Sequence, residues 1–354
     1  INMFIKRFIQ IFVIGFVLIN WSLASEQLPV KYGQLELLSR AKVAEISKKE
    51  LADVVKEESK KNADDDGYLA HPKATDCFDA WGYRYTGGRY NNELIRFRLR
   101  QPPKIVPGKK YPLIVWFHGK GESSNDNERQ LAHLHYTLPF LTGPESLDFF
   151  MLVTQCPKDN PYWETSISKD DKGDAPFTIT TEIFEQILNE FPIDQKRITT
   201  FGMCSGSTGS TMFFNKYSQL ISAIVYISAA RPTTLISEIP IYSFHCTHDV
   251  KMPIQGMRDY VNKVNEEGGN ASLIEFKSTG HEAWIPALSQ YKVIAWMIAQ
   301  KKDSLFSPPP GVVVVELSWR QVFIYFGIPI CCLIPFIIVR LRKWKLKSVN
   351  KNNV

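Results

Sequence analysis

The chain has 354 residues and a formal net charge of +6. This basic excess sits at the two ends, because six Lys and Arg residues follow position 339 and two more precede position 8, which leaves about −2 for the remainder. A domain so close to neutral gives no basis for nucleic-acid binding, and that class of partner is excluded.

The N-terminus has the pattern of a secretory signal. Lys6 and Arg7 precede an apolar run over residues 8–19, and the small residues Ser22 and Ala24 follow it at the spacing of a signal-peptidase site. We predict a signal peptide over residues 1–24, with an uncleaved anchor as the alternative.

Residues 25–75 are rich in charge. Residues 35–38 and 42–61 are expected to be helical and exposed, and the region is expected to be a helical pro-region or spacer or, equally, a solvated helix packed on the following domain.

Residues 76–302 alternate short apolar runs with helical stretches, which predicts one α/β domain with a mostly parallel central sheet and helices on both faces. Residues 80–85 and 94–99 are expected to be antiparallel edge strands. The other expected strands are residues 111–117, 149–155, 197–201, 239–244 and 273–276. The expected helices are residues 178–190, 205–217, 254–266 and 285–299.

Residues 202–206 read Gly-Met-Cys-Ser-Gly after the apolar run 197–201, which is the frame of a nucleophile elbow with cysteine at its centre. The strained turn needs small residues two places before and two places after the nucleophile, and the glycines satisfy this for Cys204. With Ser205 as the nucleophile, one of those places would hold the bulky Met203. We therefore predict Cys204 as the nucleophile, while a chance occurrence of the five-residue pattern is the alternative.

An oxyanion loop is expected directly after the buried strand 111–117, where the sequence reads His118-Gly-Lys-Gly. Backbone amides of Gly119, Lys120 and Ser205 are predicted to bind the carbonyl oxygen that becomes negative during attack. His118 itself is expected to be structural.

A carboxylate and then a histidine follow the candidate nucleophile at successive strand ends. Asp249 and His281 therefore complete a predicted Cys-His-Asp triad in the order of chain positions that α/β-hydrolases use. His245 and His248 are rivals as the base, but both lie on the loop of the acid.

Four motifs carry a family resemblance: His118-Gly-x-Gly-Glu122 with Asn125-Asp126-Asn127, the elbow, His245-x-x-x-Asp249 with Pro253, and Gly280-His281-x-x-Trp284. Over about residues 90–300 the chain resembles the predicted-peptidase and polyhydroxybutyrate-depolymerase-like esterase branch of the α/β-hydrolases. The resemblance implies a secreted hydrolase that transfers an acyl group to water. The chain departs from that branch by having cysteine in place of serine, as the dienelactone hydrolases do.

The cysteine was expected to be reactive. A neighbouring histidine and the N-terminus of the helix after Cys204 both favour the thiolate. Of the other cysteines, Cys331 and Cys332 lie in the apolar C-terminal stretch, which leaves Cys77, Cys156 and Cys246 for at most one disulfide.

No cofactor and no metal site are predicted, because the sequence has no Cys-x-x-Cys or His-x-x-x-His spacing. Trp163 and Trp284 are predicted to line the substrate pocket, with core packing as the equal alternative.

The C-terminus is predicted to hold a membrane anchor. A Pro-rich linker over residues 303–320 leads to an uncharged stretch and then to the basic tail 341–354. The stretch 321–340 is predicted to form a transmembrane helix with the tail in the cytoplasm and the domain outside. A buried helix and a removable sorting signal are the alternatives.

The sequence thus predicts an exported, membrane-anchored hydrolase that cleaves a small-molecule or polymeric carboxylic ester. A peptidase of the same fold is the runner-up, and a non-catalytic surface-binding protein is the second class of function.

Overall fold

The computed structural model describes residues 34–42, 69–86, 90–142, 146–164, 176–277, 280–290, 292–302 and 311–315. The predicted signal peptide 1–24, the helix expected over 42–61 (apart from its first residue), the transmembrane stretch 321–340 and the tail 341–354 lie outside these residues. Within them, no helix is long and apolar enough to cross a membrane.

The described residues form a ten-stranded sheet in the order β1-β2-β3-β5-β4-β6-β7-β8-β9-β10. The strands are β1 (Leu35–Ser39), β2 (Asp79–Arg84), β3 (Leu94–Arg100), β4 (Tyr111–Phe117), β5 (Phe150–Val153), β6 (Ile193–Met203), β7 (Ile221–Ile227), β8 (Ile241–Cys246), β9 (Ala271–Phe276) and β10 (Gly311–Val315). Pairing is antiparallel from β1 to β5 and parallel from β5 through β4 to β10. The predicted mostly parallel sheet is confirmed.

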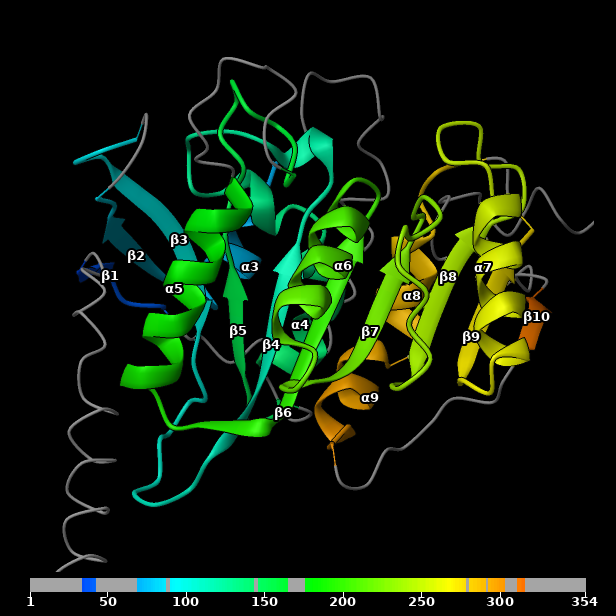
Figure 1. Ribbon diagram of the computed structural model, residues 1–354. Coiled ribbons are helices and arrows are strands. Elements are labelled where there is room, and N and C mark those ends of the chain that lie inside the picture. The colour runs from blue at the N-terminus through cyan, green and yellow to red at the C-terminus, as the bar shows by residue number, and fades with distance from the viewer. Residues whose placement is uncertain are drawn as a thin grey trace, which may run out of the picture.

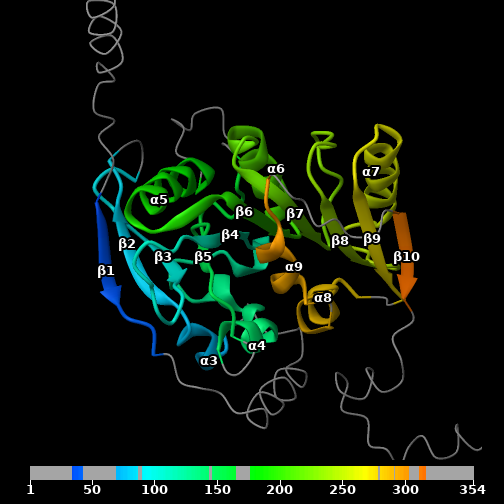
Figure 2. The same ribbon diagram turned by 90° about the horizontal axis from the view of Figure 1, so that it is seen from below.

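Helices cover both faces of the sheet. Figures 1 and 2 show α5 (Pro176–Glu190), α6 (Gly206–Tyr217) and α7 (Gln255–Glu266) on one face. The short helices on the other face are α3 (Pro72–Thr75), α4 (Leu138–Leu141), α8 (Trp284–Gln290) and α9 (Val293–Ala299). This is the three-layer arrangement that the alternation of strand and helix patterns predicted.

Strand β4 shows why a continuous apolar run predicts a central strand of the sheet. Leu113, Val115 and Phe117 belong to the hydrophobic core under α5, α6 and α7, whereas Ile114 and Trp116 belong to the core on the opposite face. Side chains alternate across a strand, so a strand buried on both faces needs apolar residues at every position.

Three expectations are wrong in detail. Residues 35–38 are not helical, because β1 pairs antiparallel with β2 and extends the sheet. The helix expected over 285–299 is two helices, since Lys292 takes a left-handed conformation with φ of 47° between them. The linker 303–320 includes β10, which pairs in parallel with β9, so the sheet extends on both sides beyond the expected domain limits of 76 and 302.

Candidate active site

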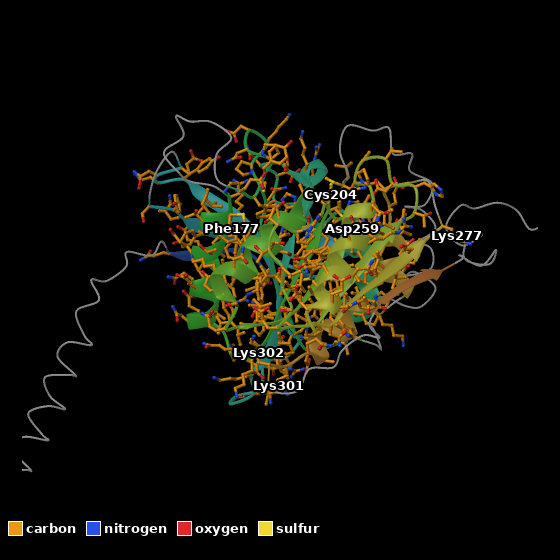
Figure 3. The ribbon with its side chains drawn as sticks, turned by 45° about the vertical axis from the view of Figure 1, so that its right-hand side comes forward. Phe177, Cys204, Asp259, Lys277, Lys301 and Lys302 are labelled. Atoms are coloured by element: carbon orange, nitrogen blue, oxygen red, sulfur yellow. The ribbon has the colours of Figure 1, made fainter. Side chains whose placement is uncertain are left out.

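The predicted site residues gather at one edge of the sheet. Cys204 follows β6, the loop beginning at His118 follows β4, and Asp249 and His281 lie in the connections after β8 and β9. Parallel strands bring their carboxyl ends to the same edge, where open α/β sheets build their sites. Figure 3 shows Cys204 at this edge, while Lys301 and Lys302 lie at the opposite one.

The backbone at Cys204 has the strained geometry of an elbow. Its φ is 51°, a left-handed conformation that is costly for a residue with a side chain. The amide of Cys204 donates to Ile227 O at 2.9 Å, and the Cys204 carbonyl accepts from the Ser207 amide at 3.1 Å. Strand β7 and helix α6 therefore hold the turn from both sides.

The two glycines of the elbow are required by close approach. A Cβ at Gly202 would lie 2.6 Å from the carbonyl oxygen of Gly206, and a Cβ at Gly206 would overlap the carbonyl oxygen of Phe117. Larger residues would separate β6 from α6 and α6 from β4. The reason given for the Gly-x-Cys-x-Gly spacing therefore holds in the structure.

The pKa of the Cys204 thiol is raised, so the protonated thiol is favoured over the thiolate. Burial raises its pKa above the ordinary value, and the nearby charges of Glu122 and Asp249 raise it further. Hydrogen bonds from the backbone amides of Ser205 and Lys120 lower the pKa but do not offset the burial. The backbone amides favour the thiolate as the sequence analysis expected, but they act on a desolvated sulfur near two carboxylates, so the pKa of the thiol stays raised.

Two of the three amides predicted for the oxyanion hole reach the sulfur. They belong to Lys120 and Ser205. Gly119 also adjoins the elbow, since a Cβ built on it would lie 3.2 Å from the Cβ of Cys204.

His118 fixes the loop that carries these amides. Its Nε2 accepts the Cys156 amide at 2.9 Å, so Nδ1 carries the proton and donates to Gly119 O at 2.6 Å. Burial lowers the pKa of the His118 imidazole, which keeps the ring neutral. His118 is thus structural in its contacts, as the sequence analysis expected.

Asp249 and His281 form a buried pair. His281 Nδ1 donates to Asp249 Oδ2 at 2.6 Å, and Asp249 Oδ1 accepts the amides of Lys251 and Met252, each at 2.9 Å. Ser228 Oγ donates to the backbone carbonyl of His281 at 2.5 Å, and Ser228 directly follows the residue that binds the Cys204 amide. His281 Nε2 is buried and has no hydrogen-bond partner among the described residues.

The two rival histidines make other hydrogen-bond contacts. His245 is fully buried behind Asp249, with Nε2 2.7 Å from the carbonyl oxygen of Met252. His248 is exposed and its Nδ1 lies 3.0 Å from Thr247 Oγ1. The hydrogen bond to Asp249 therefore favours His281.

A second buried carboxylate–imidazole pair adjoins Cys204, and sequence reasoning gave it no role. Glu122, 2% exposed, accepts from His133 Nε2 at 2.8 Å through Oε1. The other oxygen, Oε2, has no partner in the described residues and lies 2.9 Å from where a Cβ of Gly119 would be. Glu122 belongs to the family-like motif, but nothing in the sequence marks His133 as its partner.

The two tryptophans are both buried. Trp163, 1% exposed, donates its indole N–H to His118 O at 2.9 Å and packs on Phe117, so it supports the oxyanion loop rather than lining an open pocket. Trp284, 3% exposed, lies with its ring 4.6 Å from that of His133 and 5.6 Å from that of His281.

No disulfide joins the cysteines in the described part of the chain. They are Cys77, Cys156, Cys204 and Cys246. The single disulfide that the cysteine count permitted is therefore not formed. Within the same residues, no group of three or more His, Cys, Asp or Glu side chains is arranged to hold a metal ion.

Comparison with solved structures supports the fold. A thermostable esterase superposes with a TM-score of 0.56 at 26% sequence identity, over 64% of each chain. An acylaminoacyl peptidase from Pyrococcus horikoshii gives 0.48 at 14% identity, over 66% of this chain and 43% of the peptidase. The fluorophosphonate-binding serine hydrolase F of Staphylococcus aureus gives 0.48 at 12%, over 62% and 98%.

The chain thus spans less than two thirds of the esterase and less than half of the peptidase that it matches. No protein-family model matches the sequence, and no curated protein matches it significantly. The strand order, the elbow after β6 and the likeness to the esterase together show an α/β-hydrolase fold.

Proposed function

We propose that the protein is a hydrolase that cleaves carboxylic esters through a thioester on Cys204. The observation that carries the proposal is the buried Asp249–His281 pair, whose Nε2 is unpartnered, at the same sheet edge as an elbow cysteine that receives two backbone amides. These are the acid, base, nucleophile and anion-binding groups of acyl transfer.

Acylation begins from the protonated thiol. Because the pKa of Cys204 is raised, His281 Nε2 takes the Sγ proton as sulfur attacks the ester carbonyl. Asp249 stabilises the imidazolium that forms. The amides of Lys120 and Ser205, with Gly119 as the third predicted donor, hold the oxyanion.

The tetrahedral intermediate then collapses. Its C–O bond breaks, and the proton on His281 Nε2 passes to the departing alcohol, which leaves a thioester on Cys204. In the second half-reaction His281 takes a proton from water, the resulting hydroxide attacks the thioester, and the same proton returns to sulfur as the acid departs.

An ester is favoured over a peptide bond as the substrate because the first tetrahedral intermediate can expel either the Cys204 thiolate or the substrate's leaving group. The alcohol of an ester, protonated by His281 as it departs, leaves more readily than the amine of a peptide. A peptidase is therefore the runner-up within the same mechanism.

The test is turnover of short p-nitrophenyl esters by the purified protein. Cys204→Ala is expected to abolish turnover and the thioester adduct seen by intact-mass spectrometry, whereas Cys77→Ala, which removes a cysteine outside the site, retains both. Turnover that persists in Cys204→Ala would remove this thiol from the mechanism.

A specific observation favours a second class of function. The raised pKa of Cys204 means that the resting site holds a weak nucleophile, which suits a non-catalytic binding protein that keeps the fold. Absence of a thioester adduct in the wild-type protein with every ester tested would favour this alternative.

Location is part of the proposal. The signal-like residues 1–24 and the uncharged run 322–339 support an exported domain anchored by a C-terminal helix, with the membrane as a partner and the site on the extracytoplasmic side. Protease added to intact cells expressing the full chain is expected to digest the domain, while the tail stays protected.

A further inference from the structure

His245 is a buried imidazole near the site that has no role in the mechanism above. It lies near the end of β8, four residues before Asp249, and is completely buried. Its Nε2 lies 2.7 Å from the carbonyl oxygen of Met252 and 3.4 Å from Asp249 Oδ2, the oxygen that also accepts from His281.

The contacts of His245 define its tautomer. A carbonyl oxygen only accepts hydrogen bonds, so Nε2 must carry the proton and donate to Met252. Nδ1 is buried without a partner within the part of the chain that the structure describes, and burial lowers the pKa of the ring. A second proton would leave a buried Nδ1–H without an acceptor among the described residues, so His245 stays neutral and does not relay protons.

The groups around His245 are consistent with this fixed state. Asp249 and His281 lie on one side. On the other, Glu275 of β9 is opposite His245 in the strand register, and Arg258 of α7 neutralises it by donating to both its carboxylate oxygens at 2.7 and 2.6 Å. The negative charge of Glu275 is thus already matched by a cation.

Hydrogen bonds hold the turn 249–252, which carries the Asp249 carboxylate, at both of its ends. Asp249 Oδ1 accepts the amides of Lys251 and Met252, which fold the turn on itself. The bond from His245 to Met252 O ties the far end of that turn back to β8. This side-chain bond acts beside the backbone bond from the Asp249 amide to Cys246 O at 3.4 Å, and together they hold the turn that keeps the carboxylate against His281.

We propose that His245 is a positioning residue that fixes the turn 249–252 through its Nε2–H, so that the Asp249 carboxylate remains against His281 Nδ1. The inference rests on the proposed function in assigning Asp249 as the acid, but the hydrogen bond it protects is observed independently of any reaction.

The experiment compares two substitutions in the full-length protein. His245→Gln keeps an N–H that can reach Met252 O, whereas His245→Leu has similar bulk and no donor. His245→Leu is expected to lower kcat about 10- to 100-fold with KM little changed, because misplaced catalytic groups cost rate rather than binding. His245→Gln is expected to retain most of the activity, and His248→Ala, on the same loop but exposed, is the matched control.

A second readout does not depend on turnover. The proton that His281 Nδ1 shares with Asp249 is expected as a low-field signal in the proton NMR spectrum of the wild type, His245→Gln and His248→Ala. It is expected to be lost or shifted upfield in His245→Leu. If the wild type hydrolyses no ester, this comparison still tests the positioning, so the two proposals fail separately.

Two results would overturn the inference. One is an unchanged signal and kcat in a folded His245→Leu protein. The other is equal loss in His245→Gln and His245→Leu, which would mean that the imidazole acts by shape and not through its N–H. If His245→Leu does not fold, His245→Asn takes its place, because its shorter amide falls short of Met252 O.

Discussion

Two buried carboxylate–imidazole pairs lie near the Cys204 thiol, and they differ in which side-chain atom has no hydrogen-bond partner among the described residues. In the Asp249–His281 pair the carboxylate is fully engaged and the free atom is the imidazole Nε2. In the Glu122–His133 pair the free atom is the carboxylate Oε2. One pair therefore presents a base to the site, and the other presents a negative charge.

The difference explains how similar groups have opposite effects on the chemistry. The free nitrogen of His281 can take a proton from the thiol and so promotes attack. The charge of Glu122 raises the pKa of Cys204 and so keeps the proton on sulfur until a base removes it. The atom of such a pair that has no hydrogen-bond partner, rather than the residue types in the pair, therefore decides its role.

The largest expected effect comes from breaking the first pair. Asp249→Asn preserves shape but no longer holds His281 in the tautomer with Nδ1–H. We expect kcat for ester hydrolysis to fall by about 10³- to 10⁴-fold. The protein should remain folded, with a thermal transition close to that of the wild type. A loss below tenfold would show that His281 does not depend on this carboxylate.

Trp284 connects the two pairs, because its ring contacts both His133 and His281. Trp284→Phe leaves space beside the base, and we expect kcat to fall by about tenfold since the imidazole loses its fixed orientation. KM should hardly change, as the side chain is buried. A raised KM with normal kcat would instead show that Trp284 lines the substrate pocket, as the sequence analysis predicted.

Removing the charge of the second pair should change the reactivity of the Cys204 thiol. In Glu122→Gln the side chain can still accept from His133, but the repulsion of the thiolate disappears. The pKa of Cys204 should fall, so the pH at which iodoacetamide alkylation is half-maximal moves downward and alkylation at neutral pH accelerates severalfold.

Glu128→Gln is the matched control for that experiment, because Glu128 is exposed and lies six residues further along the same loop. It should leave the alkylation profile unchanged. A profile that is equally unchanged in Glu122→Gln would mean that the charge of Glu122 does not raise the thiol pKa.

Sequence reasoning located one pair and missed the other for a physical reason. Asp249 and His281 each follow an apolar run that reads as a buried strand, and the ends of parallel strands must meet. Glu122 and His133 both lie in a long connection between β4 and β5 made of short 3-10 turns, which have no periodic pattern. Their contact depends on how that loop folds on itself.

The wrong elements have similar causes. Residues 35–38 are too few for a helical period to be told from a strand, and only pairing with β2 decides between them. The raised pKa of the Cys204 thiol could not be predicted, because the helix N-terminus is visible in the sequence, whereas the depth of burial and the approach of Glu122 are not. Placement at the sheet edge is readable from sequence, but the electrostatic balance is not.

The smallest expected effect concerns stability in acid. The hydrogen bond from His133 holds the folded-state pKa of Glu122 below the ordinary value of 4.5 despite complete burial. A depressed folded-state pKa stabilises the protein fully above the unfolded-state pKa, and this contribution is lost as pH falls through that region toward the folded-state value.

The free energy of unfolding of the wild type, measured relative to Glu122→Gln by urea denaturation, should therefore be constant from pH 7 to about 5 and decline below about 4.5. Burial also lowers the pKa of His118 and His245, which weakens both proteins below neutrality. The His245 contribution cancels in the difference, whereas the His118 contribution cancels only in part, because the charge of Glu122 raises the pKa of His118 in the wild type alone. A difference that grows as the pH falls would mean that burial, and not His133, dominates the titration of Glu122, and that the second pair presents a neutral carboxyl rather than a charge to Cys204.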